Sequence, residues 1–113
     1  MTVRQIRLTT TGRRTGQDHE VVVYAFPDAD RHVVVGSYAG RSKDPDWAAN
    51  LRASPRATVR TGRQSTDCQA REVEGAERER LWDLVVGEFP MYETYAARTE
   101  RAIPLFVLEP VGG

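Results

Sequence analysis

The sequence predicts an α+β domain built on an antiparallel sheet, with about six strands and two or three helices. First, segments rich in β-forming residues follow one another closely, with turn residues between them. Second, the stretch 76–98 carries apolar residues at helical spacing, so most of the helix comes late in the chain. Third, a length of 113 residues suits one domain spanning residues 1–113. Strands adjacent in sequence favour hairpins, and a small barrel would remove their exposed edges.

Three strands are expected in the first part of the chain. Residues 3–11 are rich in β-formers, and the sequence GRRTG at 12–16 then marks a turn with two glycines. Residues 19–26 contain three consecutive valines, and residues 31–38 form the next strand. The sequence PDAD at 27–30 predicts the turn between these two strands, because proline presets φ and aspartate bonds nearby backbone groups.

A helix is expected over residues 45–53. Asp44 followed by Pro45 is the pattern of an N-cap residue followed by proline at the first helical position. Ser54-Pro55 ends the helix, because the residue before proline is disfavoured in the α conformation.

Five further segments follow: strands at 56–62 and 66–74, helices at 76–88 and 90–98, and a strand at 102–109. Pro104 falls early in the last strand, which indicates an edge or bulge position.

The charges are unevenly divided, although 16 basic residues balance 16 acidic ones. Residues 1–63 hold ten Arg and one Lys against six acidic residues, whereas residues 64–113 hold five Arg against ten. A basic front half suits a small anionic ligand, and nucleic-acid-binding proteins usually show a strong overall basic excess. We therefore expect a small-molecule ligand and no nucleic-acid partner.

Several classes of protein are excluded by what the sequence lacks. No apolar run approaches the roughly 20 residues of a transmembrane helix, and the N-terminus does not resemble a signal peptide. A single cysteine, Cys68, permits no intramolecular disulfide and is expected to be buried or inert. His19 and His32 do not make a metal site without a third ligand. We expect a cytoplasmic protein that binds no metal.

Three clusters carry residues suited to ligand chemistry. The first, residues 9–16 (TTTGRRTG), combines hydroxyls, glycines and two guanidinium groups that could hold phosphate or carboxylate, although a plain polar turn has the same composition.

The second cluster, residues 36–47 (GSYAGRSKDPDW), runs from a strand end into a helix N-terminus. Small residues there let a flat ring approach the backbone, and free helix amides attract anions. The alternative is a capped loop that only begins a helix.

The third cluster, residues 89–95 (FPMYETY), places Tyr92 and Tyr95 three residues apart and therefore on one face of a helix. Two phenols at a pocket could bind an aromatic substrate or donate a proton, and the alternative is aromatic packing in the core.

Together the clusters resemble the deazaflavin (F420)-dependent nitroreductase, or F420H2-dependent quinone reductase, family. The resemblance is carried in order and spacing by LTTTGRRTGQ (8–17), VVVGSYAG (33–40), PDWAANLRASPRATV (45–59), AREVEGAERERLW (70–82) and FPMYETYAARTERAIPLFVLEP (89–110). This chain departs from the family pattern at His19, where a basic residue is common, at Ala39, where glycine is common, and at Phe89, where tyrosine is common.

The resemblance implies a split β-barrel of the FMN-binding type, a homodimer, and coenzyme F420, which is a 5-deazaflavin with a phosphate and an acidic oligoglutamate tail. By position it implies that the phosphate and tail lie at Thr11, Gly12, Arg13, Arg14, Thr15 and Gly16. It places the ring system against Ser37, Tyr38, Ala39 and Gly40, and the adjoining helix start at Pro45, Asp46, Trp47 and Asn50. Tyr92 and Tyr95 would face the substrate.

The function implied by this resemblance is transfer of a hydride from reduced F420 to a quinone, enone or nitro-type acceptor. The cofactor would supply the reducing power, and the protein would supply orientation and charge. Two alternatives stay open: a non-catalytic binder of a fatty-acid-like or other anionic ligand, and a split barrel that binds FMN or haem.

Overall fold

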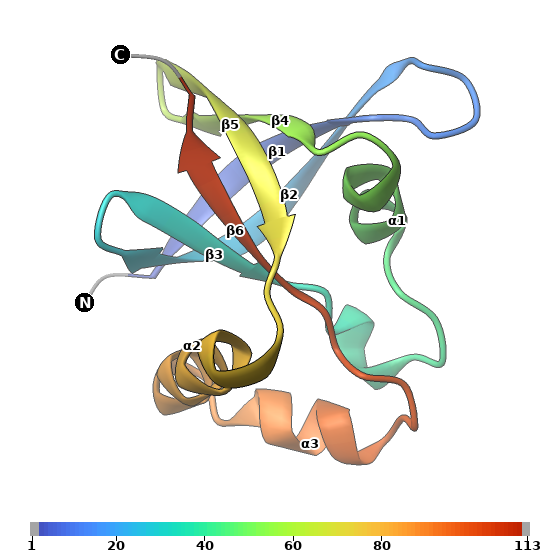
Figure 1. Ribbon diagram of the computed structural model, residues 1–113, viewed down its shortest axis with the longest axis vertical. Coiled ribbons are helices and arrows are strands. Elements are labelled where there is room, and N and C mark those ends of the chain that lie inside the picture. Colours follow the sequence, from blue (N-terminus) through green and yellow to red (C-terminus); the bar gives the residue numbers. More distant parts are fainter. Residues whose placement is uncertain (1–2, 112–113) are drawn as a thin grey trace.

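The computed structural model of the protein describes residues 3–111 and shows a closed barrel with helices packed around it (Figure 1). The strands are β1 (Arg4–Thr11), β2 (Asp18–Asp28), β3 (Arg31–Val35), β4 (Arg56–Thr61), β5 (Gln64–Glu72) and β6 (Leu105–Pro110). The helices are α1 (Asp46–Ala53), α2 (Gly75–Glu88) and α3 (Met91–Ala97), with a short 3-10 turn η1 (Tyr38–Gly40). The expected antiparallel α+β barrel is confirmed. That residues 1–113 form one domain stays a prediction, since residues 1, 2, 112 and 113 lie outside the described part.

The strand order around the barrel is β1-β2-β3-β6-β5-β4, and every neighbouring pair is antiparallel. Pairing of Leu8 with Val59 belongs to the β1–β4 ladder that closes the cylinder. The β1–β2 hairpin pairs Thr11 with Asp18, so its turn is the glycine-flanked segment between them, as expected. The sequence predicts a four-residue turn at 27–30, and this is wrong, because Pro27 is still in β2 and pairs with His32.

Apolar side chains form two cores, one on each face of the sheet. Inside the barrel, Leu8, Val34 and Phe106 are buried, and Trp47 of α1 packs edge-on against Phe106 with ring centroids 5.9 Å apart. This core also contains Cys68, a free cysteine whose thiol pKa is raised by burial, as expected of an inert group. Helix α1 therefore covers the barrel interior at one end.

The second core lies outside the barrel, beneath α2 and α3. Phe26 and Val33 point outward from β2 and β3, and they meet Leu81 and Val85 of α2 together with Tyr92 of α3. In Figure 1 these two helices lie together on one side of the barrel, away from α1. A strand with one face on each core needs apolar residues on both faces, which explains the valine run 33–35 of β3; in the run 21–23 of β2, Val21 and Val22 are exposed.

The last strand departs from the sequence expectation. Pro104 was predicted at an edge or bulge, and this is wrong, because β6 lies between β3 and β5 and pairs with both. Pro104 comes just before the strand, where its missing N–H costs no ladder bond, and its carbonyl accepts the N–H of Gly36 at 2.8 Å. That bond marks the end of β3, which stops at Val35 rather than at residue 38.

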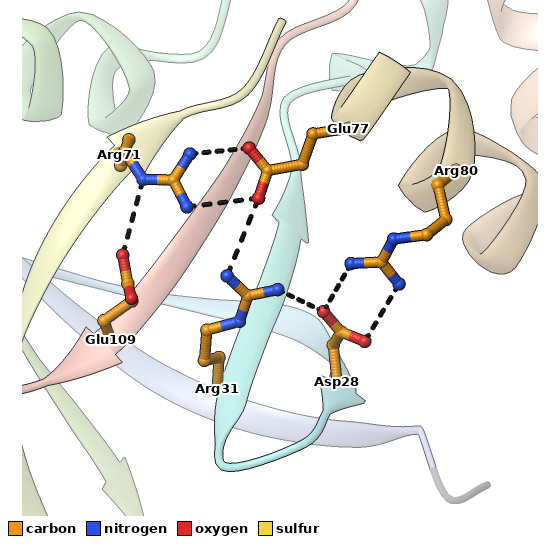
Figure 2. Close-up of polar contacts among 6 residues, drawn as sticks. All are labelled: Asp28, Arg31, Arg71, Glu77, Arg80 and Glu109. Carbon is orange, nitrogen blue, oxygen red and sulfur yellow. Dashed lines mark hydrogen bonds and ion pairs between the residues drawn. The ribbon is translucent and has the colours of Figure 1, made fainter.

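A network of ion pairs fastens α2 to the barrel (Figure 2). Arg71 of β5 donates to both carboxylate oxygens of Glu77 at 2.6 and 3.1 Å, and Arg80 donates to both oxygens of Asp28 at 3.2 and 3.0 Å. Arg31 links the two pairs, since it contacts Asp28 and also Glu77 at 3.6 Å. Glu109 of β6 joins through Arg71 at 3.4 Å. The guanidinium of Arg80, ahead of that of Arg31, lowers the pKa of Asp28 below its ordinary value.

Candidate functional site

A cavity of about 460 Å³ lies where the β1–β2 turn, the loop after β3 and the start of α1 meet. It is lined by Thr10, Gly12, Arg13, Arg14, Thr15, His19, Val21, Tyr38, Pro45, Asp46, Trp47 and Asn50. Segments from both of the first two sequence clusters therefore face one space. Small-molecule sites have volumes of about 300–1,000 Å³, so this one can hold a flat ring system with a tail reaching outside.

The β1–β2 turn is shaped by its own backbone. The N–H of Gly12 donates to the carbonyl of Gln17 at 2.7 Å, and the N–H of Gly16 donates to the carbonyl of Gly12 at 2.8 Å. Gly16 has a φ of 75°, a conformation that glycine adopts without steric cost. The turn thereby projects Arg13, Arg14 and Thr15 at its tip, where all three are exposed.

Asn50 of α1 fixes one of these arginines. Its side-chain oxygen accepts from the backbone N–H of Arg13 at 3.2 Å and from Nη1 at 2.8 Å. Its side-chain nitrogen donates to Oγ1 of Thr10 at 3.2 Å, and both Asn50 and Thr10 are buried. Arg13 also pairs with the exposed carboxylate of Asp46 at 3.3 Å. Helix α1, which covers one end of the barrel, therefore holds the guanidinium of Arg13 at the cavity through Asn50.

Arg14 differs from Arg13 in its partners. It forms no ion pair or side-chain hydrogen bond with any of residues 3–111, while it lines the same cavity. The ion pair of Arg13 with Asp46 is mostly solvated, because Asp46 is 82% exposed, and such pairs are weak. Both guanidiniums are thus available to an anion at the mouth of the cavity.

His19 and Val21 are cavity residues that the sequence prediction missed, and Thr10 is a member of the first cluster that the expected cofactor set left out. His19 pairs with Thr10 across the hairpin, and Val21 pairs with Leu8, so all three lie on the face that points into the barrel end. Side chains alternate between the two faces of a strand, so this alternation could have placed His19 and Val21 on the same face as Thr10. The prediction also needs the pairing register of β1 and β2, because a slip of one residue would turn His19 to the opposite face.

The 3-10 turn η1 presents Tyr38 to the cavity in an unusual backbone conformation. Tyr38, Ala39 and Gly40 have successive φ values of 46°, 53° and 78°. Left-handed backbone favours glycine, so Tyr38 and Ala39 are strained here. The Tyr38 ring lies 4.6 Å from the guanidinium carbon of Arg41, a cation–π contact.

Five members of the expected cofactor set do not line the cavity: Thr11, Gly16, Ser37, Ala39 and Gly40. Ser37 and Gly40 are buried, and a Cβ on Gly16 would meet no atom within 4 Å. Thr11 points to the other side of β1, into a separate hollow of about 160 Å³ shared with Arg56. The cavity therefore takes one residue, Tyr38, from η1.

The beginning of α1 corrects one sequence expectation. Asp44 was predicted as the N-cap, and this is wrong, because the helix begins at Asp46 after Pro45 and has no side-chain cap. The carboxylate of Asp44 instead accepts from Arg52 and from Arg101, each at 2.6 Å. Two charge-assisted bonds outweigh one bond to a backbone N–H.

The phenols of Tyr92 and Tyr95 lie apart from the cavity lining. Their rings are 6.2 Å apart and edge-to-face, which agrees with the expected shared helix face. Tyr92 is buried in the outer core against Phe26, and burial, with smaller effects of Tyr95 and Tyr24, raises its pKa to about 12. Tyr95 is half-buried, its hydroxyl contacts Sδ of Met91 at 3.6 Å, and its carbonyl lies where a Cβ on Gly40 would come within 2.9 Å.

Two features are absent from residues 3–111. No group of three or more His, Cys, Asp or Glu side chains is arranged to hold a metal ion within that range. None of the helices there combines the length and apolar character needed to cross a bilayer.

A closed barrel with a cationic turn beside a cavity that has apolar walls is suited to a small anionic ligand with a flat ring, and comparison with known proteins identifies the family. The family model described as F420H(2)-dependent quinone reductase matches residues 1–110. An F420H(2)-dependent quinone reductase of Mycobacterium tuberculosis is 32% identical over 104 residues, covering 89% of this chain and 70% of that protein. The chain belongs to the F420H(2)-dependent quinone reductase family, whose members are oxidoreductases that use coenzyme F420. The resemblance seen in the sequence is confirmed.

Solved structures agree with this assignment. A structure described as an F420-H2 dependent reductase superposes with a TM-score of 0.84 at 36% identity, covering 93% of each chain. Another, described as a domain-swapped dimer, gives a TM-score of 0.85 at 36% identity and covers 93% of this chain and 79% of that one. A haem storage protein of Vibrio cholerae has a TM-score of 0.73 at 16% identity, with 96% and 82% coverage, and shows the shared fold alone.

Proposed function

We propose that the 460 Å³ cavity binds reduced coenzyme F420 and that the protein uses it to reduce a quinone. The observation that carries the proposal is the pair of guanidiniums, Arg13 and Arg14, at a cavity whose apolar lining includes Val21 and Trp47. F420 has a flat ring system, which suits the apolar side chains, and an anionic phosphate and tail, which suit the two guanidiniums. When bound, reduced F420 supplies a hydride, which together with one proton converts the acceptor to its reduced form.

The residues of this chain then have distinct tasks. Arg14, which has no ion-pair partner among the described residues, binds the phosphate or tail, and Arg13 does so from the position that Asn50 fixes. Tyr38 and Trp47 give the ring system aromatic and apolar walls, which also exclude water from the reacting face. Orientation of the two reactants is the main contribution the protein makes to a hydride transfer.

Of the two late phenols, we assign contact with the acceptor to Tyr95. Tyr92 is covered by the outer core, and a phenol whose pKa is about 12 is a weak proton donor near neutral pH. Tyr95 borders η1 through the close approach of its backbone to Gly40. Enones and nitro compounds are further acceptors that the same chemistry allows.

We also propose that the protein is a homodimer. The support is the similar solved structure described as a domain-swapped dimer. Light scattering coupled to gel filtration should give twice the mass of the chain, and a monomer at micromolar concentration would contradict this.

The test of function is a titration of F420 into the purified protein, followed by its fluorescence, and then oxidation of reduced F420 on addition of menadione. Arg14→Gln should weaken F420 binding roughly tenfold at low salt, because one charge-assisted contact is lost. Arg63→Gln is the matched control: it removes an exposed arginine from the β4–β5 turn, outside the cavity lining, and should bind F420 normally. Failure of the wild-type protein to bind F420, or equal binding of FMN or a fatty acid in its place, would overturn the proposal.

A further inference from the structure

The loop that brings Tyr38 to the cavity holds a backbone conformation that its own residues disfavour. Tyr38 and Ala39 both have positive φ, a conformation that side chains with a Cβ disfavour because the Cβ crowds the following carbonyl oxygen. A strained segment of this kind persists only when the surrounding structure holds it. Local bonds are few: the N–H of Gly40 donates to Ser37 at 2.8 Å, and the N–H of Arg41 donates to Tyr38 at 3.1 Å.

Arg101 supplies the missing restraint from the far end of the sequence. Its Nη2 donates to the carbonyl of Ser37 at 2.8 Å, and its Nε donates to the carbonyl of Arg41 at 2.9 Å. These two carbonyls flank the three left-handed residues on either side. Its Nη1 donates to the carboxylate of Asp44 at 2.6 Å, and the side chain is only 14% exposed.

The three contacts need a guanidinium. They use three different nitrogens of one planar group, and an ammonium group concentrates its donors at a single point. The charge is balanced at Asp44, whose other oxygen accepts from Arg52. Arg52 is held in turn by both oxygens of Glu72 at 2.8 and 2.9 Å, so the restraint is anchored to α1 and β5.

The other side of the turn is closed by close packing. A Cβ on Gly40 would come within 2.9 Å of the Tyr95 carbonyl and 3.1 Å of Cβ of Arg98, so the turn cannot move toward α3. Arg101 is the polar partner that prevents it from moving away. Arg101 itself does not line the cavity. Tyr38, which lies within the segment that Arg101 holds, and Pro45, which follows that segment, both line it.

We propose that Arg101 is a positioning residue of the cofactor site: it grips the carbonyls of Ser37 and Arg41 and so holds the strained turn that presents Tyr38 to the cavity. The inference rests on the proposed function, because it takes the cavity to be the F420 site. The restraint itself is a property of the protein without any cofactor, and it can be measured there.

The experiment compares Arg101→Met and Arg101→Lys with a control of similar burial, Arg31→Met. Arg31 is 19% exposed and bridges Asp28 and Glu77 in the ion-pair network, and none of these three residues lines the cavity (Figure 2). Amide hydrogen exchange of Gly40 and Arg41 is followed by NMR on each folded protein without cofactor. F420 binding is then measured by fluorescence titration.

Arg101→Met should raise the exchange rates of the Gly40 and Arg41 amides roughly tenfold or more and weaken F420 binding by a similar factor, because bonds from a charged group are lost. Arg101→Lys, which keeps the charge and guards against a failure of the first variant to fold, should give a smaller increase in exchange. Arg31→Met should leave both readouts at wild-type values even where it lowers global stability.

Unchanged exchange at Gly40 and Arg41 in both Arg101 variants, or the same increase in Arg31→Met, would overturn the inference. If the wild-type protein does not bind F420, the proposed function fails, and the exchange rates still decide whether Arg101 holds the turn.

Discussion

The side-chain oxygen of Asn50 accepts two hydrogen bonds from Arg13, one from its backbone and one from its guanidinium. Asn50→Ala removes both, and it leaves the buried Thr10 hydroxyl without its partner. We expect the free energy of unfolding to fall by about 2 kcal/mol, with a weaker affinity for F420. Urea denaturation and fluorescence titration measure the two effects.

Asn50→Asp separates the structural effect from the electrostatic one. A carboxylate can still accept from Arg13 and from the Thr10 hydroxyl, so stability should fall less than in the alanine variant. Its charge competes with the anionic cofactor for Arg13, so F420 affinity should fall at least as far. An aspartate variant that binds F420 as tightly as the wild type would contradict the assignment of Arg13 to the anionic end.

Gly12→Ala tests how closely His19 lines the cavity. A Cβ at residue 12 would come within 2.7 Å of Nε2 of His19 and 3.0 Å of Oγ1 of Thr15, so the imidazole must move. The φ of Gly12 is not in the left-handed region, and His19 is exposed, so stability should change by less than about 1 kcal/mol. F420 binding should weaken, because the displaced ring changes the cavity wall.

The double variant Gly12→Ala/His19→Ala supplies the control. Removing the imidazole makes room for the new methyl group, so the two substitutions should be non-additive in F420 affinity. If the effects of the two substitutions on the free energy of F420 binding simply add, the loss of affinity in Gly12→Ala does not come from displacement of His19.

Tyr92 should make stability depend on pH in alkaline solution. Its pKa is raised to about 12 from an ordinary value of 10.0, so the folded state retains the proton that the unfolded state releases. The resulting stability is present below about pH 10 and is lost as the pH rises through about 12. Tyr92→Phe, followed by urea denaturation at a series of alkaline pH values, should lose less stability over that interval than the wild type.

The same variant tests catalysis. No side-chain hydrogen bond of the Tyr92 hydroxyl is found to residues 3–111, so Tyr92→Phe should keep near-normal stability and quinone reduction near neutral pH. A large loss of turnover without a loss of folding would make Tyr92 the proton donor after all.

Asp28→Asn tests the ion-pair network of Figure 2. The pKa of Asp28 is lowered by Arg80 and Arg31, so its stabilising effect is present above the ordinary value of 3.8 and is lost as the pH falls through the folded-state pKa. We expect a loss of about 2 kcal/mol near neutral pH, since two guanidiniums lose their shared anion. Urea denaturation in neutral and acid buffers should show the difference from wild type shrinking as the pH falls, and a constant difference would contradict this account.

Local patterns predicted most of the fold, because strands and turns leave short-range signals. The valine runs marked β2 and β3, and the glycines at 12 and 16 marked the turn that carries Arg13 and Arg14. The same patterns placed much of the cavity lining, because the turn and the start of α1 are each continuous in sequence.

Contacts between distant residues explain what was missed. Asp44 has the sequence position of an N-cap, and only the approach of Arg101, far along the chain, makes it an ion-pair partner instead. The left-handed turn at Tyr38 contradicts the preference of its own residues, so no local pattern could predict it. Helical spacing showed that Tyr92 and Tyr95 are neighbours, yet which of them the barrel covers depends on how α3 docks.

The late position of β6 in the sequence has a consequence for biosynthesis. A nascent chain cannot complete the cylinder until the ribosome has delivered residue 110, although β3, which β6 must join, was finished some seventy residues earlier. Until then β3 and β5 each expose an unpaired row of backbone N–H and carbonyl groups, which other chains can join. Premature stop codons or proteolytic trimming before residue 105 should therefore yield aggregating chains that engage chaperones, rather than smaller working enzymes.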